Sequence, residues 1–484
     1  MKKIWCLLLG LVIFLYGCQR TPDIPSVISK NNGLFEGQTA KEMPESAGEA
    51  QTIQCTESFA STDGSIMFSW NINQAINVSS KPVIEVVPHF LAGEEVERVA
   101  HAVCGNVNFY EMEHENQKQF SKDELRDMIE MLSQYANPEA YGQLEGRKDE
   151  RKHFQHEIER LNEMILDYTE MMESAPVENP HCPCEWRFRP EADYFDGREN
   201  VDQLIRARVN LDGRKYTLNA VTRNEPDFKL NGITLSLGCE PMEKKIYRAD
   251  LCRSGFPTEE QMRLAAEKAQ EILDRIDLGK WEIAGVDILK EKAGTIEEYE
   301  IQVKMVPVFE GYSALEGQRI GALNGENTYA SNYYMTSAFF NFSSDGILTY
   351  FALTSPVDVQ RVVNPSPATM SLKDLMDRIQ SQLSLCNQDA YFGLASREIT
   401  AIRDHLEEEI LCRVSITGLE YGLARVKVKD SENAYYYLPA ITCIGDVEYY
   451  GKTSGMIYTS NDLAEGEAVH LLWLNAIDGS VITQ

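Results

Sequence analysis

Three stretches of the chain repeat one order of elements, and this order constrains the fold more than any other feature of the sequence. In each stretch an expected helix precedes several expected strands, the last two of which are joined by an Asp-Gly pair. Asp-Gly between apolar strands predicts a tight hairpin, because glycine accepts a positive φ. The three pairs are Asp212-Gly213, Asp345-Gly346 and Asp478-Gly479. The sequence therefore predicts an α+β chain of repeated units.

The second and third stretches have the clearest helix starts. Thr258 and Gln261 fit a capping box that opens a helix to about Asp277. Ser371 is a natural N-cap before apolar residues that recur at helical spacing. The strands expected after these helices lie at 281–290, 297–309, 333–342, 347–351, 410–417, 422–429, 435–444 and within 471–482.

The first stretch carries a helical insertion at about 113–180. One helix is expected from Ser121 to Tyr135, and a second pattern continues from Pro138 to about Glu173 with its apolar residues on one stripe. We expect a helical hairpin packed on its own domain, and a docking helix for a partner is the alternative. Outside the insertion, strands are expected at 65–72, 82–88, 203–211 and 214–222, with a helix at 93–104.

The start of the chain predicts export. Lys2 and Lys3 precede an apolar stretch from Ile4 to Tyr16, which as a helix would span only about 20 Å, too short for a bilayer core of roughly 30 Å. This is typical of a signal peptide, and its ending resembles a bacterial lipobox with Cys18 as the lipidated residue. Dual acylation at Cys18 would hold the protein on the membrane. An uncleaved signal anchor and a secreted protein without lipid are the alternatives.

These features predict five segments. They are the signal peptide 1–18, a flexible tether 19–52 rich in polar residues, Pro and Gly, an N-terminal domain 53–250 with the insertion, and two modules at 251–356 and 357–484. The expected location is the outer face of the cytoplasmic membrane.

Charge excludes some partners. The formal net charge is −29, and the loss of Lys2 and Lys3 with the signal lowers it by two, to −31. Such an acidic chain repels phosphate backbones, which excludes nucleic acid as an expected partner. Of the eleven cysteines, nine remain after Cys6 and Cys18 are set aside, and their spacing shows no disulfide framework.

The end of the chain resembles a known family of modules. The strings Tyr437-Leu438-Pro439-Ala440 and Leu474-Asn475-Ala476-Ile477-Asp478-Gly479 are similar to PepSY-like modules, and especially to the tandem units of YycI/YycH-type envelope regulators. The layout also resembles an uncharacterised lipoprotein family of Gram-positive bacteria. The resemblance implies tandem cystatin-like units with a helix on an antiparallel sheet. It also implies regulation by protein contact, inhibition of a peptidase or binding at the envelope, with no catalytic residue to transfer.

One group of residues has metal-ligand character. His153 and His156 are three residues apart on an expected helix, and Cys182 and Cys184 could complete a zinc site, because imidazole and thiolate are good zinc ligands. The alternative is a solvated helix face beside thiols or a disulfide. Motifs of serine hydrolases, zinc proteases and calcium loops are absent from the sequence, and no cofactor is expected.

Tyrosines cluster on expected strands, as in Tyr435-Tyr436-Tyr437 and Tyr449-Tyr450. Adjacent strand residues face opposite sides, so one of each pair should be exposed or at an interface. The functional interpretation is a peptide-binding face, and ordinary strand propensity is the alternative.

The sequence as a whole predicts a non-enzymatic, membrane-tethered lipoprotein that binds or regulates another envelope protein or peptide. An exported hydrolase with an unrecognised active site and a solute-binding lipoprotein are the competing predictions.

Overall fold

The structure is a computed structural model. It describes residues 51–112, 121–136, 148–177, 182–190, 203–224, 229–238, 255–293, 296–315, 336–386, 410–428, 431–455, 457–460 and 469–482. The predicted signal segment with Cys18, and the predicted tether up to residue 50, lie outside the described residues. Within those ranges no helix is both long and apolar enough to cross a membrane.

The middle of the chain forms a ten-stranded antiparallel sheet. Its path is β11-β12-β14-β15-β10-β9-β8-β6, with β13 paired to β12 and β7 to β8. The strands are β6 (Tyr110–Glu111), β7 (Arg189–Pro190), β8 (Gln203–Leu211), β9 (Arg214–Asn224), β10 (Lys229–Leu237), β11 (Lys280–Ala293), β12 (Ile296–Phe309), β13 (Tyr312–Ser313), β14 (Ser337–Phe342) and β15 (Leu348–Thr354).

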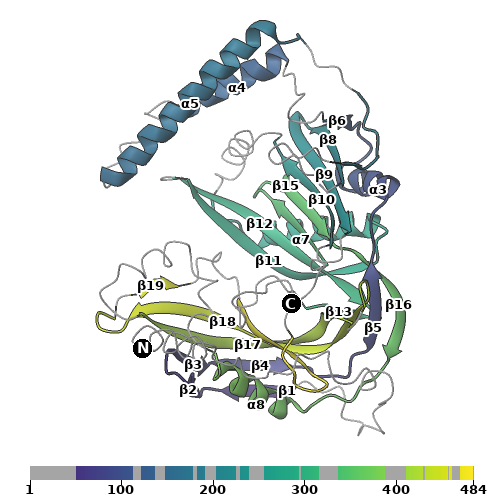
Figure 1. Ribbon diagram of the computed structural model, residues 1–484, viewed down its shortest axis with the longest axis vertical. Coiled ribbons are helices and arrows are strands. Elements are labelled where there is room, and N and C mark those ends of the chain that lie inside the picture. The colour runs from purple at the N-terminus through teal and green to yellow at the C-terminus, as the bar shows by residue number, and fades with distance from the viewer. Residues whose placement is uncertain are drawn as a thin grey trace, which may run out of the picture.

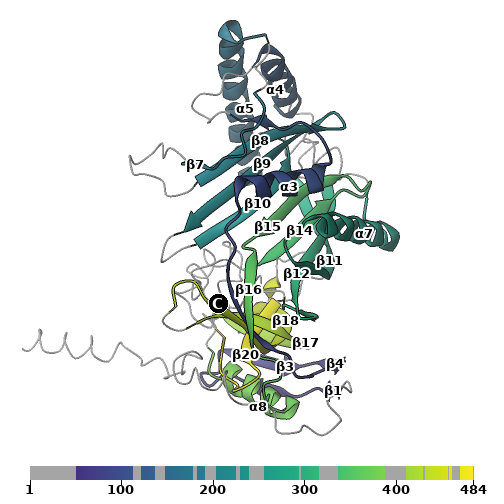
Figure 2. The same cartoon turned by 90° about the vertical axis from the view of Figure 1, so that its right-hand side faces the viewer.

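Two helices cover one side of this sheet, α3 (Gly93–Cys104) and α7 (Glu259–Arg275). Each has one apolar face, and both faces enter the same core as the inward residues of β8, β9, β10, β14 and β15. Figure 2 shows both helices on the same side of the sheet. We call this sheet with α3 and α7 the first lobe.

The two ends of the described chain meet in an eight-stranded sheet. Its path is β16-β5-β18-β17-β3-β2, with β19 and β20 also paired to β18, and only the β17–β3 pair is parallel among the described pairs. The strands are β2 (Ser58–Ala60), β3 (Ile66–Trp70), β5 (Val83–Pro88), β16 (Val357–Asn364), β17 (Ile410–Lys427), β18 (Tyr435–Gly451), β19 (Ile457–Ser460) and β20 (Val469–Asn475).

Helix α8 (Leu372–Leu383) packs its apolar face on this sheet, beside the small pair of β1 (Gln51–Cys55) and β4 (Ile72–Ile76). We call these elements the second lobe, which lies below the first in Figure 1.

The insertion forms a helical arm made of α4 (Lys122–Tyr135) and α5 (Lys148–Ser174). The two helices pack chiefly on each other through a seam that includes Leu125, Leu132 and Leu161. The arm lies at one end of the molecule in both views (Figures 1 and 2). The first predicted helix is confirmed, and the second begins in the described residues at Lys148.

The predicted fold class is wrong. The structure is 50% strand and 23% helix, with large multi-stranded sheets in place of tandem helix-on-sheet modules. Strand β10 of the predicted N-terminal domain pairs with β15 of the next segment, and β3 and β5 pair with strands from the end of the chain. An apolar pattern tells which face of a strand is buried but does not name its partner, so local patterns could not show this long-range pairing.

Local predictions fared better. The Thr258–Gln261 capping box is present at the start of α7, and Ser371 caps α8. The Asp212-Gly213 turn joins β8 to β9 with φ of 51° and 81° at the two residues, as a type I′ turn requires. These elements are encoded by neighbouring residues, which is why a pattern of a few positions predicts them.

Candidate functional site

Two neighbouring chain segments connect one lobe to the other. Residues 88–92 lead from β5 to α3, and residues 354–357 lead from β15 to β16. The segments are antiparallel, and the His89 backbone N–H donates to the Pro356 carbonyl at 2.9 Å. We call this double crossing the junction.

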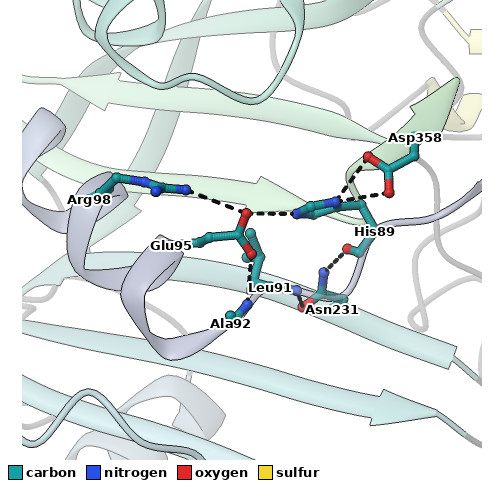
Figure 3. Close-up of polar contacts among 7 residues, drawn as sticks. All are labelled: His89, Leu91, Ala92, Glu95, Arg98, Asn231 and Asp358. Carbon is teal, nitrogen blue, oxygen red and sulfur yellow. Dashed lines mark hydrogen bonds and ion pairs between the residues drawn. The ribbon is translucent and has the colours of Figure 1, made fainter.

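Asn231 of β10 ties both segments to the first lobe. Its side chain is fully buried, its Nδ2 donates to the His89 carbonyl, and its Oδ1 accepts the Leu91 N–H at 3.4 Å (Figure 3). Its own backbone carbonyl accepts the Ser355 N–H at 2.6 Å. One carboxamide thus supplies a donor and an acceptor to backbone groups that would otherwise be buried without partners.

The His89 ring lies between two carboxylates. Its Nδ1 is 3.0 and 3.1 Å from the two carboxylate oxygens of Asp358 on β16, and its Nε2 is 3.2 Å from Oε1 of Glu95 on α3 (Figure 3). The side chains of His89 and Glu95 are 22% and 20% exposed, and that of Asp358 is 55% exposed. The ring therefore connects an element of the first lobe with a strand of the second.

Glu95 has a second task at the start of α3. Its Oε2 accepts the Ala92 N–H at 2.8 Å at the start of the helix, and its Oε1 also lies 3.5 Å from Nη2 of Arg98. These contacts fix the carboxylate that faces His89, since its position is set by the helix end itself.

This arrangement suits a structural contact that depends on charge. Both ring nitrogens of His89 face carboxylate oxygens, so neither presents a lone pair toward an open site. A general base needs such a lone pair within reach of its substrate. The geometry therefore favours a role in holding the lobes together.

An apolar cluster backs the junction. It unites Phe309 and its neighbours on β12 with β5, β17 and β18, and the Phe309 and Tyr437 rings lie 4.4 Å apart. Beside it, Leu315 donates its backbone N–H to the Leu423 carbonyl at 2.8 Å. The lobes thus share a buried core.

Two cations border the shared core, the half-buried Lys81 and the buried Lys304. Lys81 lies over the rings of Tyr312 and Tyr421 at 5.0 and 5.4 Å, and burial lowers the pKa of Lys81 while the Glu282 carboxylate opposes this. Lys304 of the first lobe lies 3.1 Å from Asp287. Burying a charged amine costs free energy, and these contacts offset part of that cost.

His470 on β20 is buried, and its pKa is lowered to about 4 by burial and by the charge of Lys304. Its Nδ1 lies 3.3 Å from the Thr442 hydroxyl, and its ring lies 5.2 Å from that of Trp473. It is a neutral histidine at physiological pH.

The structure does not test the predicted metal site. The backbones of His153 and His156 belong to α5, but their side chains lie outside the described residues. Cys182 is exposed, and the half-buried Cys184 has its pKa raised to about 12, chiefly by burial, so its thiol is neutral. In the described part of the chain, no three His, Cys, Asp or Glu residues are grouped as a metal site would require.

The tyrosine prediction needs correction. Tyr435, Tyr436 and Tyr437 are all buried, because β18 is covered on both faces. Tyr435 and Tyr437 do lie at an interface, but it is the one between the two lobes. The predicted peptide-binding face is therefore not formed by these three residues.

The junction was missed at the level of sequence. Its members are separated by up to 269 positions, as for His89 and Asp358, and they carry no shared motif. The sequence indicates only the helix at 93–104, on which Glu95 lies.

Comparisons with known proteins do not show a family for this chain. No protein-family model matches the chain, and no curated protein matches it. A crystal structure of an uncharacterized protein from Eubacterium rectale is similar at 10% identity, over 93% of this chain and 96% of that chain, with a TM-score of 0.31. This similarity is too low to indicate a shared fold or function.

Proposed function

We propose that this protein is a lipid-tethered extracytoplasmic lipoprotein that acts by binding another envelope protein, and that the helical arm is its contact element. The tether rests on the lipobox-like ending at Cys18. The single observation that carries the contact role is the outer face of α5, which points away from the seam with α4.

That face has an unusual composition. Glu159, Glu163, Leu166, Glu170 and Glu173 follow one another at helical spacing, and all five are exposed. They lie opposite Leu161, which is buried in the seam with α4. We call this set the acidic stripe. Like charges three or four residues apart on a helix repel one another, as Glu170 and Glu173 do here.

A comparison with α7 shows what an ordinary exposed face looks like. There Arg263 pairs with both Glu260 and Glu267, so opposite charges alternate along the helix. The acidic stripe carries no basic residue, and at its centre Leu166 is 64% exposed. Charge complementarity therefore points to a partner with a basic surface and an apolar pocket for Leu166.

A crosslinking experiment tests this proposal. A photoreactive amino acid at position 166 in intact cells should give an adduct with one envelope protein, and the crosslinked peptide should lie in a basic patch. The same label at Leu264, which is 50% exposed on α7, is the matched control and should give no such adduct. Equal adducts from both positions would overturn the arm as the contact element.

Charge reversal supplies the second measurement. Glu163→Lys with Glu170→Lys should lower the yield of the adduct at position 166 at least tenfold, because like charges would then meet. Glu259→Lys with Glu271→Lys on α7 changes the net charge equally and should leave the yield unchanged. Separately, Cys18→Ala should release the protein from the membrane fraction, and full retention would contradict lipidation.

A further inference from the structure

We propose that β16 is a self-association surface, through which the outer edge of the eight-stranded sheet pairs with the same edge of a second copy of this chain. The inference stands on the order of the side chains along β16. It does not depend on the arm, on the lipid anchor or on any other partner.

Strand β16 lies at the outer edge of its sheet. It ends the strand path, and in the described part of the chain β5 is the one strand that pairs with it. In Figure 1 it follows the rim of the molecule, and in Figure 2 it faces the viewer. An edge strand presents backbone N–H and C=O groups that can form hydrogen bonds with another strand.

The composition of β16 does little to prevent such pairing. Proteins protect exposed sheet edges with charged residues, with proline or by keeping the edge strand short. The edge strand β11 has six charged residues among fourteen, and the edge strand β2 has only three residues. In contrast, β16 has four valines and two charged residues among eight, and Val359 and Val362 are 48% and 40% exposed. Strand β16 therefore combines an outer backbone edge with exposed apolar side chains.

The side chains of β16 are arranged symmetrically about Val359 when they are counted by their partners on β5. An acidic and a basic residue stand one step to either side of Val359, and a valine stands two steps to either side. These residues are Asp358 and Arg361, then Val357 and Val362. The register shift between Val359 and Arg361 produces this symmetry, because it brings Arg361 onto the same face of the sheet as Asp358.

A second copy that pairs antiparallel with β16 would match this order. A two-fold axis perpendicular to the sheet places Asp358 of each copy opposite Arg361 of the other, and Val357 opposite Val362. Pairs of opposite charge and apolar pairs across neighbouring strands stabilise a sheet. The same axis brings Val359 of the two copies next to each other. Because one strand supplies both halves of every pair, the geometry favours a second copy over an unrelated peptide.

Both charged side chains are accessible, although each contacts its own chain. Asp358 lies beside His89, and Arg361 donates its Nε–H to Glu85 at 2.7 Å. The side chains of Asp358 and Arg361 are nevertheless 55% and 58% exposed. A carboxylate accepts several hydrogen bonds and a guanidinium donates several, so the contacts within the chain are compatible with pairing between copies.

Crosslinking of the full chain in intact cells tests this surface. A photoreactive amino acid at position 359 should give an adduct of twice the mass of the chain, and the crosslinked peptide should come from β16. The same label in place of Ile283 on the edge strand β11, which is 38% exposed, is the matched control and should give no such self-adduct. If position 359 gives no self-adduct, or gives an adduct with a different protein, the proposal is overturned.

Two charge variants test the register of the pairing. Asp358→Arg places like charges opposite each other on both sides of the axis, and Arg361→Asp does the same. Each variant alone should therefore lower the yield of the self-adduct at position 359 at least tenfold. When both variants are produced in one cell, opposite charges face each other again in the mixed pair, and the yield should recover at least fivefold. This recovery requires that both variants fold. An unchanged yield in either single variant, or no recovery in the mixture, would contradict the pairing.

Discussion

The junction and the helical arm are held together by different kinds of contact. At the junction, Asn231, His89 and Asp358 come from distant parts of the chain and meet around two crossing segments. At the arm, α4 and α5 pack chiefly on each other, and the acidic stripe faces outward. One region is held by long-range contacts and the other by local ones. We infer that the junction fixes the relative position of the lobes. A partner that binds the arm would leave that position unchanged.

The largest effect of a single substitution is expected in the core that the two lobes share. Phe309→Ala should lower the free energy of unfolding by about 3–4 kcal/mol, because it removes a buried ring and leaves a cavity between the lobes. Urea unfolding measures this loss. Phe256, which is exposed, is the control, and Phe256→Ala should cost far less. A loss below 1 kcal/mol at position 309 would mean that the lobes do not depend on this core.

The Asn231 side chain is the next test. Asn231→Ala should cost about 2–3 kcal/mol, because it leaves the His89 carbonyl and the Leu91 N–H without their partner in a buried place. The same variant should raise hydrogen exchange at 88–92 more than in α8. Uniform exchange changes across both lobes would contradict a local clamp.

Acid should weaken the second lobe through His470. The folded-state pKa of about 4 lies below the unfolded value of about 6.5, so the unfolded state binds the proton first as pH falls. The free energy of unfolding should be highest above pH 6.5 and should fall by about 3 kcal/mol on the way to pH 4. His470→Gln should flatten this window in urea titrations at several pH values. An unchanged slope would show that other groups cause the acid sensitivity.

The smallest effect is expected on the arm. Leu166→Ala should change stability by less than about 0.5 kcal/mol, since its side chain is already in water. Leu161→Ala, five residues earlier on the same helix, should sharply increase hydrogen exchange of α5, because its side chain is buried in the seam with α4. Similar behaviour of the two variants would mean that the acidic stripe is part of a packed surface.

Local parts of this fold could be predicted from the sequence. Thr258 with Gln261, Ser371 and the Asp212-Gly213 turn each act on backbone groups within a few positions, and all three appear as expected. The repeated order of helix and strands also suggested repeated modules, and that step failed. Strand β5 finds β16 and β18 across more than 250 positions, and no local pattern distinguishes these partners from nearer ones.

In the candidate site, too, the sequence predicts the local element but not the long-range contacts. The sequence predicts the helix at 93–104 that carries Glu95, but the contacts of His89 with Asp358 arise only when β5 and β16 are paired. The sequence by itself determined where several helices begin, where a hairpin turns, and that the chain is acidic, because these properties depend on neighbouring residues or on the sum of the charges. Only the tertiary structure decided which strands share a sheet and that a histidine joins two lobes. Such contacts depend on the burial of whole faces, which no single stretch of the chain contains.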